Sequence, residues 1–242
     1  MKDKIKNFFN NLKENSNMKM VYALLFATVI LFVYFYFGSY SAFEKFFPNL
    51  QNLDFWKVIY HNCMAFVLFF GLGFVFSKFV LKNNVEQMGL KKGNYKLGLI
   101  LCGIASIIVP LLALSTVLSP EMCETYPMIN FATFGNWYYI LSYFVSYFLY
   151  YVGWEFLFRS VILFSCEEKC GVLGAIVIST LVSALIHSSI AGFGKPMVET
   201  LSAIPAGLIF GYITSKTKSI YYSLYIHMLV GFLTDMFIVL LV

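Results

Sequence analysis

Residues 153–159 read Gly-Trp-Glu-Phe-Leu-Phe-Arg and set an acid and the only arginine of the chain inside a long aromatic and aliphatic run. Glu155 and Arg159 are four residues apart, so on a helix they lie one turn apart on the same face and can pair. A charged side chain is costly to insert into a bilayer, so within a span it marks a functional site by default. The other interpretation is an ion pair that only locks one helix to its neighbours.

The composition places this segment in a membrane protein. The 242 residues are 60% hydrophobic and 12% charged, with a mean hydropathy of +0.77. A soluble domain has about 45–50% apolar and about 25% charged residues. Several apolar runs approach the roughly 20 residues that cross a bilayer. We therefore expect an all-α, polytopic membrane bundle, with the lipid bilayer as its surroundings.

Seven apolar runs are separated by short polar connections, and no linker or repeat divides the chain. Residues 1–19 are expected to form a cytoplasmic tail or a short amphipathic surface helix, and residues 20–242 a single transmembrane domain. The run from Trp137 is too long for one crossing, so it is tilted or broken near Gly153, and the expected number of spans is seven or eight. The expected spans are about Met20–Phe37, Val58–Leu81, Leu97–Leu118, Trp137–Ser165, Gly171–His187, Glu199–Thr214 and Tyr221–Val242.

The formal net charge of +5 comes from dispersed lysines rather than from one basic patch, which argues against a nucleic-acid partner. Lysines concentrate in the N-terminal tail, in residues 78–96 and in residues 216–218. With seven spans these segments share one side, which the positive-inside tendency makes cytoplasmic. The sequence predicts a multi-pass cell-membrane protein with a cytoplasmic N-terminus.

Two histidines lie in or beside later spans, at His187 and His227. A carboxylate and two imidazoles gathered in a dry environment suit the activation of water, with the acid as proton acceptor and the histidines as orienting or oxyanion-stabilising groups. The two histidines could instead hold a metal such as zinc. They are 40 residues apart, so only the tertiary fold can bring them together. The expected span boundaries put Glu155 and His227 toward one side of the membrane and His187 toward the other.

Three segments resemble the motifs of the CPBP family (CAAX protease and bacteriocin-processing, also called Abi), which includes the Rce1-type prenyl-protein endopeptidases. Those motifs are E-E-x-x-x-R, F-x-x-x-H and H-x-x-x-N, and the resemblance covers roughly residues 85–242. Here they correspond to residues 154–159, 183–187 and 227–231, and residues 207–212 and 217–220 are similar to further family segments. The resemblance implies an intramembrane endopeptidase acting on a peptide or prenylated-protein substrate, with or without a metal held by His187 and His227.

The chain departs from these motifs at three positions. Trp154 stands where the family has its first glutamate, Ser183 replaces the phenylalanine, and Gly231 replaces the asparagine. The first glutamate is the one usually assigned as the catalytic base, so either Glu155 or another acid must take its role. Glu199 is the second candidate, twelve residues after His187, although an acid there also caps a helix. Asp235 is a third acid within an apolar run.

The leading hypothesis is therefore an endopeptidase in which Glu155 or Glu199 activates water, His187 and His227 orient it, and Arg159 holds the acid. The loss of the first glutamate and of the asparagine supports an alternative, a catalytically silent homologue that acts as a membrane immunity or partner-binding protein. A small transporter is a third interpretation, which rests on the intramembrane charges alone.

Overall fold

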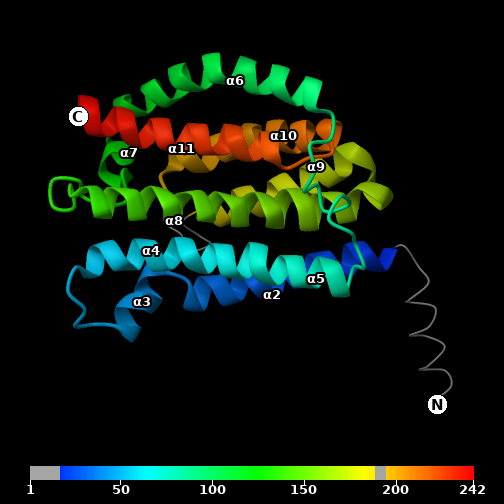
Figure 1. The fold of residues 1–242 in the computed structure, drawn as a ribbon, viewed down its shortest axis with the longest axis horizontal. Helices are drawn as coiled ribbons and strands as arrows, with labels where there is room; N and C mark the ends of the chain where they lie inside the picture. Colours follow the sequence, from blue (N-terminus) through cyan, green and yellow to red (C-terminus); the bar gives the residue numbers. More distant parts are fainter. Residues whose placement is uncertain (1–16, 189–194) are drawn as a thin grey trace.

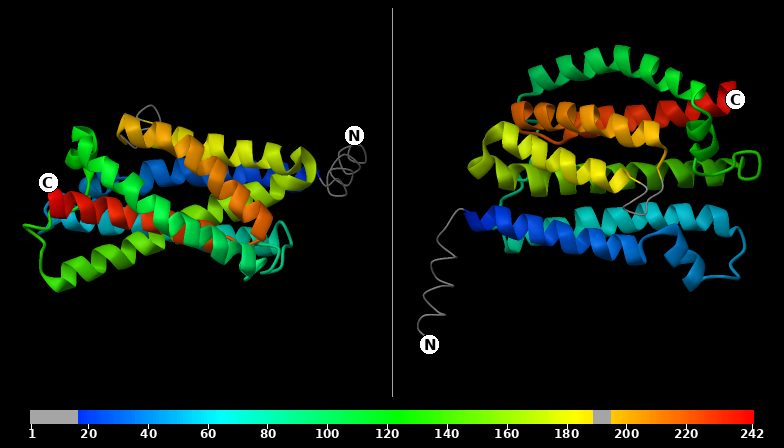
Figure 2. Two further views of the ribbon diagram at one scale, coloured as in Figure 1. Left: turned by 90° about the horizontal axis from the view of Figure 1, so that it is seen from above. Right: turned by 180° about the vertical axis from the view of Figure 1, so that it is seen from behind.

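The computed structural model describes residues 17–188 and 195–242, and every regular element in these ranges is a helix. The long helices lie roughly side by side (Figure 1, Figure 2). The expected all-α, polytopic membrane bundle is confirmed, whereas the expectation for the tail falls mostly on residues 1–16, outside the described ranges. The elements are α2 (Asn17–Phe37), α3 (Tyr40–Phe46), α4 (Leu53–Ala65), η1 (Phe66–Leu72), α5 (Gly73–Phe79), α6 (Tyr95–Ser115), η2 (Thr116–Leu118), α7 (Pro120–Thr125), α8 (Trp137–Glu155), η3 (Phe156–Phe164), α9 (Ser165–His187), α10 (Met197–Thr217) and α11 (Tyr221–Leu241).

Six helical stretches of the described residues are long and apolar enough to cross a membrane. One of them, Trp137–His187, has 51 residues, about twice what a single crossing needs. It reverses at Gly171, whose φ of 65° and ψ of 173° are not helical. Arg159 before the reversal is hydrogen-bonded to Ser179 after it, so the two arms form a hairpin (Figure 2). The six stretches of the described residues therefore supply seven helical arms, and the alternative of a break near Gly153 is wrong.

The centre of the bundle is the π-helical segment η3, in which residues 156–163 are all buried. Apolar side chains on every side suit a helix that is surrounded by other helices. Just before η3, Gly153 permits a close approach of α8 to α4, since a Cβ there would lie 2.6 Å from the carbonyl oxygen of Ala65. Glu155 and Arg159 lie at the start of this buried segment, so the fold carries both charges into its interior.

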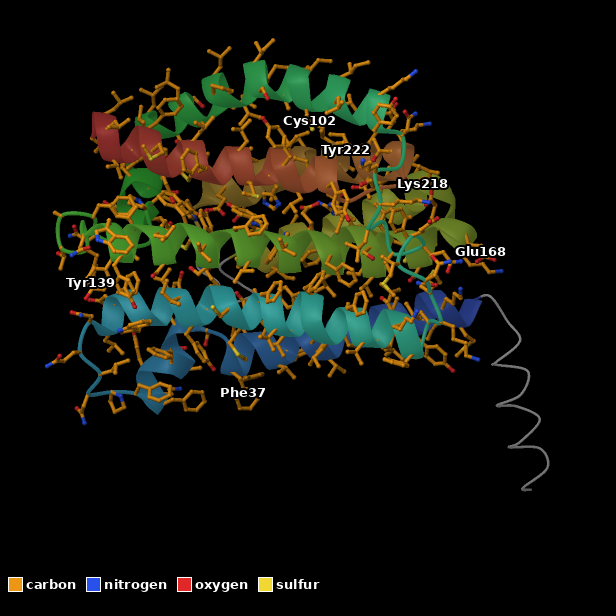
Figure 3. The ribbon with its side chains drawn as sticks, in the orientation of Figure 1. Phe37, Cys102, Tyr139, Glu168, Lys218 and Tyr222 are labelled. Atoms are coloured by element: carbon orange, nitrogen blue, oxygen red, sulfur yellow. The ribbon has the colours of Figure 1, made fainter. Side chains whose placement is uncertain are left out.

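The bundle has two chemically different ends. We call the end with the start of α2, the 80–94 connection, the Gly171 turn and the α10–α11 turn the lysine-rich end; there Lys218 pairs with Glu167, and Lys19 is hydrogen-bonded to Asn83. The opposite, lysine-poor end contains residues 38–52, residues 119–136 and the start of α10. Figure 3 labels Lys218 and Glu168 at the first end and Tyr139 at the second.

Candidate active site

Glu155 and Arg159 form a buried ion pair. Their side chains are 0% and 2% exposed, and Arg159 Nε lies 3.7 Å from Glu155 Oε2, so the pairing expected from the four-residue spacing is present. The distance exceeds a hydrogen bond. Arg159 Nη1 instead donates to Ser179 Oγ at 2.6 Å, and Ser179 donates to the Phe158 carbonyl. Arg159 is thereby held between the two arms of the hairpin, where it fixes the carboxylate.

The other oxygen of Glu155 contacts His227. The Nδ1 atom of His227 lies 2.8 Å from Glu155 Oε1. Because a carboxylate only accepts hydrogen bonds, Nδ1 carries the proton that it donates to Glu155. The ring lies between Tyr151 and Phe210, with centroids 4.5 and 5.0 Å away. Glu155 and Arg159 therefore determine the tautomer and the orientation of His227.

A second acid–histidine pair lies nearby. His187 is the last residue of α9, and its Nδ1 is 2.7 Å from the Ser183 carbonyl, so Nδ1 is again the protonated nitrogen. Its Nε2 lies 4.0 Å from Oε1 of Glu199, in the first turn of α10, and Thr200 donates to the His187 carbonyl at 3.0 Å. The side chains of His187 and Glu199 are 13% and 20% exposed, so both are accessible, unlike Glu155.

Tyr126 and Lys195 hold Glu199 in place. Tyr126 donates to Glu199 Oε2 at 2.8 Å, Lys195 Nζ lies 3.5 Å from Oε1, and Lys195 also donates to the Tyr126 hydroxyl. Burial raises the pKa of Tyr126, and the charge of Glu199 raises it further, so the phenol stays protonated and remains a donor. The two donors hold the Glu199 carboxylate in this position.

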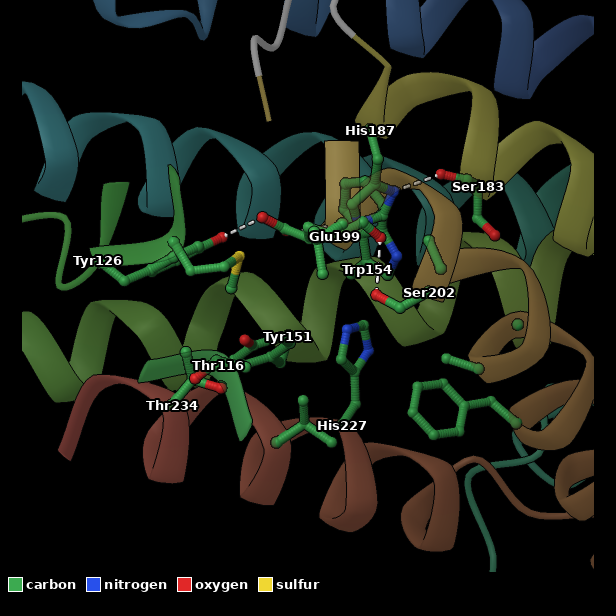
Figure 4. A pocket seen from close by; sticks show the side chains of 18 of the residues that line it. Thr116, Tyr126, Tyr151, Trp154, Ser183, His187, Glu199, Ser202, His227 and Thr234 are labelled. Atoms are coloured by element: carbon green, nitrogen blue, oxygen red, sulfur yellow. Dashed lines mark hydrogen bonds and ion pairs between the residues drawn. The ribbon is translucent and has the colours of Figure 1, made fainter. Parts of the chain in front are cut away.

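A cavity of about 160 Å³ joins the two acid–histidine pairs. His187 and Glu199 approach it from one side and His227 from the other (Figure 4). Glu155 is not among the residues that line it, although Arg159 is. Glu155 and Glu199 are the two candidates for the acid that activates water. Both lie within 4.0 Å of a histidine, but only Glu199 lines the cavity. The expected separation of His187 from Glu155 and His227 across the membrane is wrong.

The departures from the family motifs also meet at this cavity. The indole of Trp154 lies against His187, with ring centroids 5.1 Å apart, so an apolar ring occupies one flank of the imidazole. At Gly231 a Cβ would overlap the hydroxyl of Tyr151 and lie 2.9 Å from that of Tyr147. Tyr151 Oη donates to Tyr147 Oη at 2.8 Å. A phenol pair thus fills the space into which a larger residue 231 would extend.

The sequence predicts His187 and His227 as possible metal ligands. In the described ranges no three His, Cys, Asp or Glu side chains are grouped so that they could hold a metal ion. Both Nδ1 atoms are engaged, which leaves one ring nitrogen of each histidine and Glu199 around the cavity. Two imidazoles and a carboxylate are donor types that zinc accepts, but these three side chains are not grouped closely enough to hold an ion, so the proposed chemistry uses no metal.

The remaining acid, Asp235, is not among the residues that line the cavity. It is fully buried and accepts a hydrogen bond of 2.6 Å from Tyr143. Sequence reasoning missed Tyr126, Tyr151 and Lys195. The chain has 17 tyrosines, and no local pattern distinguishes the ones that the fold brings to the cavity.

Comparison with known proteins addresses this same region. Residues 136–233 match the model of the family described as type II CAAX prenyl endopeptidase Rce1-like. The matched segment contains Glu155, His187, Glu199 and His227. No curated protein and no solved structure matches the chain. The resemblance found in the sequence motifs is thereby confirmed for residues 136–233, which are similar to the Rce1-like family.

Proposed function

We propose that this protein is an intramembrane endopeptidase of the CAAX-protease type that hydrolyses a peptide bond with water held between Glu199 and His187. Support at the level of the reaction class comes from the Rce1-like family match. We assign the activation of water to Glu199 because Glu199 lines the cavity and Glu155 does not.

The pairing of Glu199 with His187 suits a water molecule. Ionised Glu199 and the unprotonated Nε2 of His187 are both hydrogen-bond acceptors, so they cannot bond to each other. The two atoms lie 4.0 Å apart. A water that donates to both along bonds of ~2.8 Å spans about 4.4 Å between its acceptors. The observed gap is close to that value. Such a water has both protons bound and a lone pair directed into the cavity, as a nucleophile requires.

In the reaction, the water oxygen attacks the carbonyl carbon and Glu199 takes the released proton. Collapse of the tetrahedral intermediate breaks the C–N bond, and the same proton passes from Glu199 to the leaving amine. The negative oxygen is stabilised by Nε2–H of His227 when that ring is protonated. Glu155 acts as a positioning residue, because its carboxylate orients His227 and stabilises the positive charge on it.

The decisive experiment compares Glu199→Gln with Glu124→Gln in purified protein. Glutamine keeps an acceptor for Tyr126 but cannot take a proton, so kcat on a fluorogenic prenylated or unmodified peptide is expected to fall about 10²–10⁴-fold. Glu124 is exposed on α7 and serves as the matched control, for which kcat is expected to stay at the wild-type value. Retention of wild-type kcat in Glu199→Gln would refute the role of Glu199.

The second candidate function is a catalytically silent homologue that confers immunity or binds a partner. The replacement of two family motif residues by Trp154 and Gly231 favours it. This function requires wild-type protein that is inert on peptides but protects cells from a bacteriocin, with equal protection by Glu199→Gln. Under the endopeptidase proposal, peptide cleavage is present and depends on Glu199.

A further inference from the structure

We infer that the cavity is reached from the lysine-poor end of the bundle, and that its substrate is a peptide segment on the extracytoplasmic side of the membrane. The identity of the reaction rests on the proposed endopeptidase function, but the direction of access rests on separate observations. These are the distribution of lysines, the depth of Glu199 and His187, and the position of the cavities.

Lysines mark the two ends very unequally. Among the described residues, three lysines belong to the lysine-poor end: Lys45, Lys57 and Lys195. The lysine-rich end has nine: Lys19, Lys78, Lys82, Lys91, Lys92, Lys96, Lys169, Lys216 and Lys218. Short loops that carry an excess of lysine and arginine stay in the cytoplasm. The lysine-poor end is therefore extracytoplasmic.

The proposed catalytic groups lie far from the lysine-rich end. Glu199 is the third residue of α10, and Lys218 directly follows the last residue of that helix. The 19 intervening steps correspond to about 28 Å along a helix, which is close to the roughly 30 Å thickness of the hydrocarbon core. His187 ends α9 at the same level, since it is 4.0 Å from Glu199. Both groups lie within a turn or so of the extracytoplasmic interface.

Cavities extend from the site toward the lysine-poor end. A second cavity of about 410 Å³ shares Trp154, His187 and Lys195 with the surroundings of the site. It is also lined by Ser39, Tyr40, Ser41, Thr125 and Met128, which belong to residues 38–52 and 119–136 at the lysine-poor end. The first cavity is bounded there by Thr116, Met122 and Tyr126 (Figure 4). Hydroxyl groups and an ammonium group thus line the route from that end to the proposed water.

The opposite route is closed by packed side chains. Between Glu155 and the Gly171 turn lie the fully buried residues Phe158, Val161, Ile162 and Leu163 of η3. Cys166, in the first turn of α9, is also fully buried. A peptide entering from the cytoplasm would have to displace this core. The geometry fits the scissile bond of an exported peptide better than that of a cytoplasmic prenylated protein.

The direction of access is tested by cysteine labelling, which does not depend on activity. In a variant with the five native cysteines replaced by alanine, Ser41→Cys reports on the second cavity and Lys96→Cys on the lysine-rich end; both positions are exposed. A membrane-impermeant maleimide applied to intact cells is expected to label Ser41→Cys, and to label Lys96→Cys only after permeabilisation. Labelling of Lys96→Cys in intact cells, with or without Ser41→Cys, would overturn the inference.

A cleavage assay then tests the substrate class. A membrane-impermeant fluorogenic peptide added to intact cells is expected to be cleaved by the wild type and not by Glu199→Gln. Cleavage that appears only after permeabilisation would overturn extracytoplasmic access while leaving the endopeptidase function intact. Failure of cleavage in both conditions would reject the endopeptidase function, and the labelling result would still decide which end of the bundle faces outward.

Discussion

Removing one partner of the Glu155–Arg159 pair is expected to destabilise the protein far more than removing both. The side chains are 0% and 2% exposed, and Arg159 has no other anion close to it in the described salt bridges. Glu155→Leu therefore leaves a buried guanidinium without a counter-charge, which costs about 3–5 kcal/mol. For a chain of this length each kcal/mol lowers Tm by about 2–4 °C, so the expected loss is about 6–20 °C.

The double variant Glu155→Leu/Arg159→Leu removes both charges and fills the space with apolar atoms. Replacing a buried ion pair in this way is often neutral or stabilising, so its Tm is expected to lie near that of the wild type. His227 loses its acceptor but is 18% exposed at the side chain, so water can replace the carboxylate. Ser179 keeps its hydrogen bond to Phe158.

Thermal unfolding in detergent, followed by circular dichroism, measures both effects. Glu168→Leu, at an exposed position near the Gly171 turn, is the matched control and is expected to change stability by less than about 0.5 kcal/mol. If the double variant is as unstable as Glu155→Leu, the reasoning from an uncompensated charge fails. The pair would then stabilise the bundle through specific contacts that leucine does not replace.

Three further substitutions test particular contacts by the same Tm measurement. Gly171→Ala is expected to cost about 1–3 kcal/mol, because the φ of 65° and ψ of 173° suit glycine alone and no neighbour lies within 4 Å of an added Cβ. Gly231→Asn is expected to cost about 1–3 kcal/mol through overlap with the Tyr151 hydroxyl, and less in the presence of Tyr151→Leu. Tyr143→Phe is expected to cost about 1–3 kcal/mol, because buried Asp235 loses its donor.

Each of these has a control or a contradicting result. Gly103→Ala, at a helical glycine whose Cβ would also meet nothing within 4 Å, is expected to be neutral or slightly stabilising, which separates backbone strain from packing. Tyr138→Phe alters an exposed phenol and should not change Tm. An equal cost of Gly231→Asn with and without Tyr151→Leu would show that the phenol is not the obstacle.

The spans were predictable from the sequence because a bilayer requires about 20 consecutive apolar residues, and such runs are visible in one dimension. The depth of the site residues in the membrane was not predictable from the sequence. The fourth span was expected to end near Ser165, but the helical stretch continues to the reversal at Gly171. Glu155 lies 16 residues before that glycine and His187 lies 16 residues after it. The two arms of the hairpin therefore return to the same level, which removes the expected separation.

Most contacts of Glu155 and Glu199 could not be predicted from the sequence either. The spacing of Glu155 and Arg159 predicted their pairing, because i and i+4 residues meet on any helix. Nothing local indicates that Glu155 contacts His227, 72 residues later, or that Tyr126 and Lys195 hold Glu199 from another part of the chain. Such contacts depend on the angles and depths at which helices pack, and these are set by the buried side chains of several helices together.

Trp154 and Gly231, which depart from the family motifs, lie around one cavity, and side chains from other helices contact the histidines there. Trp154 covers one flank of His187 with an apolar ring, while Glu199 presents a carboxylate to Nε2 of the same histidine from the next helix. Gly231 leaves a space that the Tyr151 hydroxyl fills, and Tyr151 packs on His227. Glu199 therefore contacts His187 through its carboxylate, and Tyr151 contacts His227 through its ring. The proposed endopeptidase function therefore rests on Glu199 and the two oriented imidazoles, which lie around the same cavity of about 160 Å³.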